Sequence, residues 1–102
     1  MIVCDEMKKL REMLDKKGIK WMDYSDELIE EKGYFMCRTR FLFNDKYWSV
    51  INGFGSYGGV DFETGINDGL LEVYSVGMET IGFLTAKEVM AIINWNRNGD
   101  EE

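Results

Sequence analysis

The sequence predicts an α+β fold in which an N-terminal helix, an antiparallel sheet of four to five strands and a C-terminal helix form one domain. Amphipathic segments with helical spacing stand at both ends of the chain, and the middle alternates between apolar and polar residues. Short turns join two pairs of the predicted strands, so an antiparallel sheet is expected, with both helices on one of its faces. The 102 residues suit one core, with 1–102 as a single domain and residues 1–4 and 98–102 frayed.

The first helix follows from apolar residues that recur at steps of four, three and four: Val3, Met7, Leu10 and Leu14. This spacing places the four side chains on one helix face. Asp5 is expected to cap the N-terminus, and Gly18 to end the helix in the left-handed conformation. Residues 19–24 predict a short extended segment carrying Trp21, whereas the charged residues 25–33 predict a loop or a short turn of helix.

The sheet is predicted from strict alternation over residues 34–43. One face carries the side chains of Phe35, Cys37, Thr39, Phe41 and Phe43. A turn at 44–46 joins this strand to a second one in a hairpin. The further strands are predicted over residues 47–52, 70–76 and 80–84, the last two joined by a turn at 77–79.

The C-terminal helix begins with a capping box, in which Thr85 is the cap and Glu88 stands three residues later. Its buried stripe is predicted to contain Val89, Met90, Ile92, Ile93 and Trp95.

Residues 53–69 form a loop with six glycines, and residues 53–58, GFGSYG, match the pattern GxGxxG. No predicted helix opens at the third glycine, as a dinucleotide site requires, and no kinase-sized chain follows. Glycines also let backbone N–H groups converge on an anion. The alternative is that the glycines serve tight turns between strands.

Arg38 and Arg40 are two apart on a predicted strand, so their guanidinium groups leave the same face roughly 7 Å apart. Two forked donors at that distance suit a phosphodiester or two carboxylates. The alternative is pairing across strands with acids such as Glu72. Trp48 is expected in the core, and Tyr57 is expected to be an exposed ring that could stack on a base.

Composition excludes several functions. The absence of histidine rules out Ser-His-Asp and Cys-His relays, and no local motif marks an acid or base, so the chain is not expected to be an enzyme. Net charge −7 argues against direct binding of nucleic acid. Cys4 and Cys37 are too far apart for a redox or metal pair, so free thiols are expected. No cofactor, no metal and no membrane contact is expected, and the location is expected to be cytoplasmic.

Three segments carry a resemblance: residues 48–59 (WSVINGFGSYGG), 69–72 (GLLE) and 82–90 (GFLTAKEVM). Over most of the chain, from Leu10 to the second helix, the sequence resembles small uncharacterised proteins of bacteriophages and prophages of Gram-positive bacteria. The resemblance implies a setting only. Accessory phage proteins often act against host defence, either by masking a nuclease or by sequestering a nucleotide signal.

The leading functional hypothesis is a non-catalytic homo-oligomer that sequesters a small anionic, nucleotide-like ligand. Its predicted ligand-binding residues are Arg38, Arg40, Gly53, Gly55, Ser56, Tyr57, Gly58 and Gly59. This hypothesis requires the two arginines and the loop to meet in one concave pocket.

The runner-up is an acidic inhibitor that imitates nucleic acid and occupies the basic groove of a host defence protein such as a nuclease. Its predicted partner-binding residues come from a stretch without Lys or Arg: Asp61, Glu63, Asp68, Glu72 and Glu79. A third possibility is a component of virion structure or assembly, which predicts a large apolar interface and no ligand.

Overall fold

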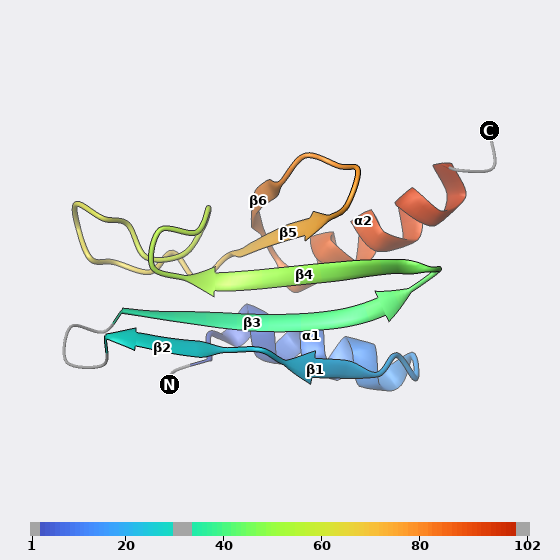
Figure 1. Ribbon diagram of the computed structural model, residues 1–102, viewed down its shortest axis with the longest axis horizontal. Helices are drawn as coiled ribbons and strands as arrows, with labels where there is room; N and C mark the ends of the chain where they lie inside the picture. The colour runs from blue at the N-terminus through green and yellow to red at the C-terminus, as the bar shows by residue number, and fades with distance from the viewer. Residues whose placement is uncertain (1–2, 30–33, 100–102) are drawn as a thin grey trace.

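The computed structural model describes residues 3–29 and 34–99. Its elements are α1 (Asp5–Lys16), β1 (Trp21–Asp23), β2 (Asp26–Ile29), β3 (Tyr34–Phe43), β4 (Lys46–Gly53), β5 (Leu71–Ser75), β6 (Ile81–Leu84) and α2 (Ala86–Gly99). This is the predicted α+β class, with one antiparallel sheet between an N-terminal and a C-terminal helix. Figure 1 shows both helices behind the sheet.

The strands lie in the order β1-β3-β4-β5-β6, and every neighbouring pair is antiparallel. β2 also pairs with β3, so β1 and β2 share one edge of a sheet that is five strands wide. The prediction of a loop or helical turn over 25–33 is wrong for β2. β3 has ten residues and β1 only three, so part of the β3 edge is left for β2 to pair with. This pairing makes β2 a strand despite its charged composition. Residues 30–33 lie outside the described residues.

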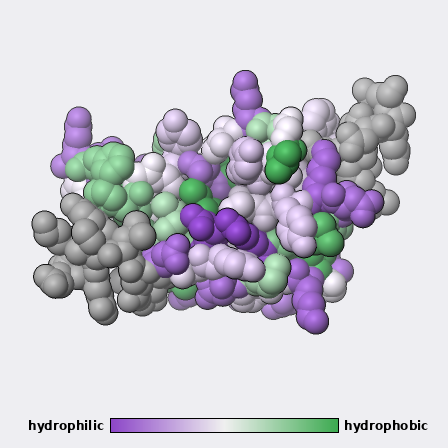
Figure 2. Space-filling view, viewed as in Figure 1, coloured by the Kyte–Doolittle hydropathy of each residue, from purple (hydrophilic) through white to green (hydrophobic). Residues whose placement is uncertain are grey.

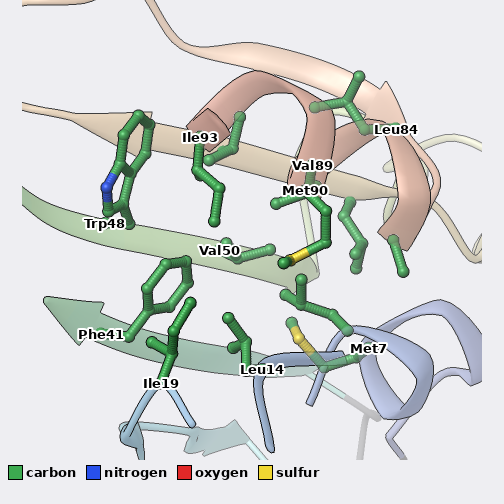
Figure 3. Packing of buried hydrophobic residues seen from close by; sticks show 14 of the residues in the cluster. Met7, Leu14, Ile19, Phe41, Trp48, Val50, Leu84, Val89, Met90 and Ile93 are labelled. Carbon is green, nitrogen blue, oxygen red and sulfur yellow. The ribbon is translucent and has the colours of Figure 1, made fainter. Parts of the chain in front are cut away.

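The core lies between the sheet and the two helices. The register sets Thr39 opposite Val50 and Phe41 opposite Trp48, and Val50 opposite Val73. These side chains are buried, and they meet the apolar faces of α1 and α2 in a single cluster (Figure 3). The predicted alternation along β3 is thus confirmed, and the structure shows that the face with Cys37, Thr39 and Phe41 is the one turned toward the helices. We call this side of the sheet the covered face, because both helices pack on it.

The helix ends follow their predicted signals in part. Gly18 ends α1 with φ +71°, as expected. Asp5 is instead the first helical residue, and Cys4 takes the N-cap position without a side-chain hydrogen bond. A cap must precede the first turn, and that turn already includes Asp5, so the cap position falls one residue earlier than predicted.

The capping box of α2 is confirmed, because Thr85 Oγ1 accepts the Glu88 N–H and Glu88 Oε1 accepts the Thr85 N–H. Trp95 corrects the predicted buried stripe: it is 71 % exposed, whereas Ile93, two residues earlier on α2, is buried in the core. The helix continues to Gly99, so residues 98 and 99, expected to fray, are helical.

Candidate functional site

The glycine-rich segment after β4 folds back on itself as a tightly bonded loop. The carbonyl oxygen of Gly53 accepts the N–H of Val60 at 2.8 Å and the hydroxyl of Ser56 at 3.1 Å. Ser56 Oγ in turn accepts the Gly53 N–H at 3.0 Å. The loop then joins β5 through the Leu70 N–H, which donates to the Gly58 carbonyl. One buried serine therefore closes the turn.

Two glycines are required by this packing. A Cβ on Gly59 would collide with Ser56 Oγ and the Gly53 carbonyl oxygen. Gly58 has φ +99°, a conformation that side chains disfavour, and a Cβ there would also meet Leu70. These contacts support the alternative interpretation, that the glycines are needed for tight turns rather than for binding an anion.

A pair of side-chain amides ties the loop to the sheet. Asn52 on β4 and Asn67 in the loop each donate to the other's carbonyl oxygen, at 3.0 and 2.8 Å. Asn52 also donates to the Leu70 carbonyl at 2.9 Å, and Asn67 accepts the Gly69 N–H. Because Asn52 is fully buried, these bonds fix the position of the loop.

Of the six loop residues predicted to bind an anion, five have N–H groups that donate to acceptors within the chain. The donors among the predicted residues are Gly53, Gly55, Ser56, Tyr57 and Gly59. The acceptor for the Tyr57 N–H is a carboxylate oxygen of Glu72, at 3.0 Å. A negative charge of the protein itself therefore stands at the position that a bound anion would take.

Phe83 on β6 lies beside Tyr57 in an unusual backbone conformation. Its φ of +58° falls in the left-handed region, which a bulky residue adopts at a cost of about 1–3 kcal/mol. The Phe83 N–H donates to the Tyr57 carbonyl, and the two rings stack with centroids 6.3 Å apart. Gly82 leaves room for this approach, because a Cβ there would collide with Tyr57. Both rings are 59 % exposed.

These residues surround a partly open cavity of about 250 Å³, the loop cavity. Its lining consists of Gly55, Ser56, Tyr57, Gly58, Gly59, Val60, Asp61, Phe62, Asp68 and Phe83. Apolar atoms lie over this loop in Figure 2, at the left of the molecule. The cavity thus combines aromatic rings with two carboxylates, and none of its lining residues is basic.

The structure does not bring Arg38 and Arg40 into the loop cavity. Both lie on β3, with side chains on the sheet face opposite the helices, the open face. Arg38 stands 4.0 Å from an Asp26 carboxylate oxygen, and the Arg40 guanidinium lies 4.9 Å from the centre of the Tyr24 ring. The single concave pocket expected from the sequence is therefore not formed, because Ile51 and Ser49 of β4 separate the arginines from β5 and the loop.

The five predicted acidic residues are divided among several places. Asp61 and Asp68 line the loop cavity, and Glu63 is exposed nearby in the same loop. Asp61 Oδ1 accepts the N–H groups of Glu63 and Thr64, which fixes that carboxylate at the rim. Glu79 lines a separate cavity beside Trp95, so the acids do not form one continuous stripe.

The open face exposes large side chains around the two arginines. Met22, Tyr24, Leu42, Tyr47 and Tyr74 are 43–63 % exposed there. Figure 2 shows this face, with strongly hydrophilic atoms in the middle and weakly polar or hydrophobic atoms around them. Sequence reasoning missed this surface and the walls Phe62 and Phe83 of the loop cavity. The alternation of aromatic residues with buried ones along β4 and β5 was the available signal.

Cys37 is buried and Cys4 is half-buried, and both are free thiols. Desolvation raises the pKa of the Cys4 thiol, so it is poorly suited to nucleophilic chemistry. Within residues 3–29 and 34–99, no three Cys, Asp or Glu side chains gather closely enough to hold a metal ion. The helices in that part of the chain are too short or too polar to cross a membrane.

Comparisons with protein-family models, with curated proteins and with solved structures found no match to this chain.

Proposed function

We propose that this protein is a non-catalytic binding protein that docks onto a basic protein surface. In this proposal a Lys or Arg side chain of the partner enters the loop cavity. The observation that carries it is the lining: three rings from Tyr57, Phe62 and Phe83, with the carboxylates of Asp61 and Asp68. Ring faces attract cations, and carboxylates accept charge-assisted hydrogen bonds from them.

Charge supports a cationic occupant over an anionic one. The two carboxylates would repel a phosphate group, and five of the six predicted loop N–H groups already donate within the chain, that of Tyr57 to Glu72. The nearest Lys or Arg in the sequence lie at 46 and 87, so the segment has no cation of its own to neutralise the carboxylates. The net charge of −7 would also speed association with a basic surface.

This proposal retains the acidic inhibitor hypothesis and narrows its contact residues to Asp61 and Asp68, with Glu63 at the rim. The resemblance to phage proteins extends the proposal to a partner class. The basic surface would then be the nucleic-acid groove of a host defence enzyme, which presents Lys and Arg side chains.

The test is a titration of the isotope-labelled protein with an oligo-arginine peptide, followed by NMR. We expect shifts at the amides that line the loop cavity, and weaker binding as salt is added. The double variant Asp61→Asn/Asp68→Asn should bind about tenfold more weakly, which corresponds to about 1.4 kcal/mol. Asn at position 61 can still accept the two loop N–H groups, so the turn is preserved.

A matched control removes the same charge elsewhere. Glu12→Gln/Glu79→Gln changes two exposed acids on α1 and before β6 and should weaken binding far less. Equal losses in the two double variants would reduce the interaction to net charge and overturn the proposal. A parallel titration with cyclic nucleotides that shifted Arg38 and Arg40 instead would restore the ligand hypothesis.

A further inference from the structure

The open face carries more exposed apolar and aromatic surface than a solvent-facing sheet needs. Both helices pack on the covered face, and Tyr47 and Tyr74 on the other side are exposed. Tyr, Met and Arg are the residues that are enriched in protein–protein interfaces. This composition indicates that the open face has a partner.

The register of the strands arranges this face in rows across β3, β4 and β5. One row contains Arg38, Ile51 and Glu72, and the next contains Arg40, Ser49 and Tyr74. In both rows the cation lies on β3, a small or apolar residue lies on β4, and the complementary group lies on β5. The face is therefore polarised across β4.

We propose that a second copy of this chain packs on the open face, with a two-fold axis that runs parallel to β4. Such an axis sets β3 of one copy over β5 of the other and leaves each β4 over its own counterpart. Arg38 then meets the partner's Glu72, and Arg40 meets the ring of the partner's Tyr74. Tyr47, which is opposite Leu42 in the third row, meets the partner's Tyr47.

The existing contacts leave these groups able to pair. Arg38 is 4.0 Å from Asp26, the limit for an ion pair, and Asp26 is well exposed. Glu72 accepts the Tyr57 N–H through Oε1. Two sheets that pack face to face align at about −30° and about 10 Å apart, which long side chains such as Arg38 can span.

The charges of the open face favour a protein over nucleic acid. Asp26 and Glu72 offset Arg38 and Arg40, so these four charges cancel and do not form a basic patch for a phosphate backbone. The same balance suits a surface that must match itself, because each copy supplies both signs. The proposed dimer uses a different surface from the loop cavity, so an experiment can contradict either proposal without contradicting the other.

The experiment is sedimentation velocity over a wide range of protein concentrations. The wild-type protein should sediment as a dimer. Arg38→Glu should be monomeric, because it sets acids against acids, and Glu72→Arg should be monomeric because it sets cations against cations. An equimolar mixture of these two variants should form the heterodimer, in which both charge pairs are restored.

Two further variants control for local structural disruption by the substitutions. Glu72→Arg also removes the acceptor of the Tyr57 N–H, so Tyr47→Asp serves as a disruption far from the loop and should also give monomers. Lys87→Glu reverses an exposed charge on α2 and should leave the dimer intact. Circular dichroism of each variant should match that of the wild-type protein.

A wild-type monomer at every concentration would overturn the proposal. So would a dimer that persists in both Arg38→Glu and Tyr47→Asp, since another surface would then hold it. Binding of the oligo-arginine peptide to the Arg38→Glu monomer reports on the loop cavity alone, which keeps the outcomes for the two surfaces distinct.

Discussion

Trp48 and Tyr47 are adjacent on β4, and their side chains lie on opposite faces of the sheet. Trp48 is 2 % exposed, packs in the core and donates its ring N–H to the Phe43 carbonyl. Tyr47 is 63 % exposed. The same contrast holds for arginines: Arg11 on the covered side donates to Thr39 and lies over the Trp21 ring, whereas Arg40 on the open face is exposed.

The side chains of the covered face form the core of the fold, and their polar groups are satisfied within the chain. Its buried polar residues Thr39, Asn52 and Ser75 all make hydrogen bonds. Within the described residues, every buried side-chain nitrogen or oxygen has a partner. The exposed aromatic residues and arginines of the open face lie outside this core, so this face is where a binding partner is expected.

The largest difference between the faces should come from paired alanine variants of the two neighbours. Trp48→Ala removes a large core side chain and should cost about 3–5 kcal/mol of unfolding free energy. Tyr47→Ala should cost less than about 1 kcal/mol within the monomer. Urea denaturation measures both, and the Tyr47→Ala effect should grow with protein concentration if the dimer forms. Similar costs at low concentration would contradict the comparison.

A buried polar residue offers the next test. Asn52→Ala leaves the Asn67 amide and the Leu70 carbonyl without their partner and should cost about 1–3 kcal/mol. Ser49→Ala, on the open face of the same strand, should change stability by less than about 0.5 kcal/mol. Amide hydrogen exchange should also rise through the loop in the Asn52 variant alone. Unchanged exchange there would show that the amide pair does not hold the loop.

The two arginines give a smaller contrast. Arg11→Ala loses the Thr39 hydrogen bond and the contact with Trp21, and should cost about 1–2 kcal/mol. Arg40→Ala should have almost no effect on the stability of the monomer, because its side chain is exposed. Thermal unfolding at low protein concentration measures both. Equal effects would show that Arg40 supports the fold as much as Arg11 does.

Local sequence patterns predicted the helices and strands well wherever the spacing of apolar residues or a capping motif marks an element. The alternation of residues 34–43 and the Thr85–Glu88 box gave strand and helix correctly, since both patterns reflect backbone geometry. β2 was missed because its pairing depends on the edge of β3, which no local window contains. Trp95 was misplaced because helical spacing does not reveal where the core ends.

The site was harder to predict for the same reason. The residues of the glycine-rich loop meet in one cavity, but the acceptor of the Tyr57 N–H is Glu72, fifteen residues further along the chain, and no local pattern reveals that contact. Arg38 and Arg40 lie on the same sheet face, as expected for residues two apart on a strand. Their distance from the loop follows from the strand order, which the sequence does not reveal. Phe83 entered the site through a bulge in β6 that no sequence signal marked, except for Gly82 beside it.

The smallest expected effect on the unfolding free energy comes from Glu6, whose carboxylate bonds to α2, compared with Glu12, an exposed carboxylate on the same helix. Glu6 on α1 accepts the Ala86 N–H at the start of α2 at 2.8 Å, and this hydrogen bond lowers the pKa of the carboxyl below its ordinary value of 4.5. A lowered pKa in the folded state means that the stabilisation is complete above pH 4.5 and is lost as pH falls below it. Glu6→Gln keeps an acceptor but removes the charge near the helix N-terminus, so it should cost about 1 kcal/mol at neutral pH.

The measurement is the unfolding free energy of both proteins against pH. The wild-type and Glu6→Gln curves should differ at neutral pH and converge as Glu6 becomes protonated below pH 4.5. Asp23, whose pKa is lowered by a hydrogen bond from Ser25, titrates in both proteins, so the difference between the curves isolates Glu6. Glu12→Gln, an exposed change on the same helix, should follow the wild-type curve throughout. Curves that stay parallel at low pH would show that the Glu6 charge does not hold α1 and α2 together.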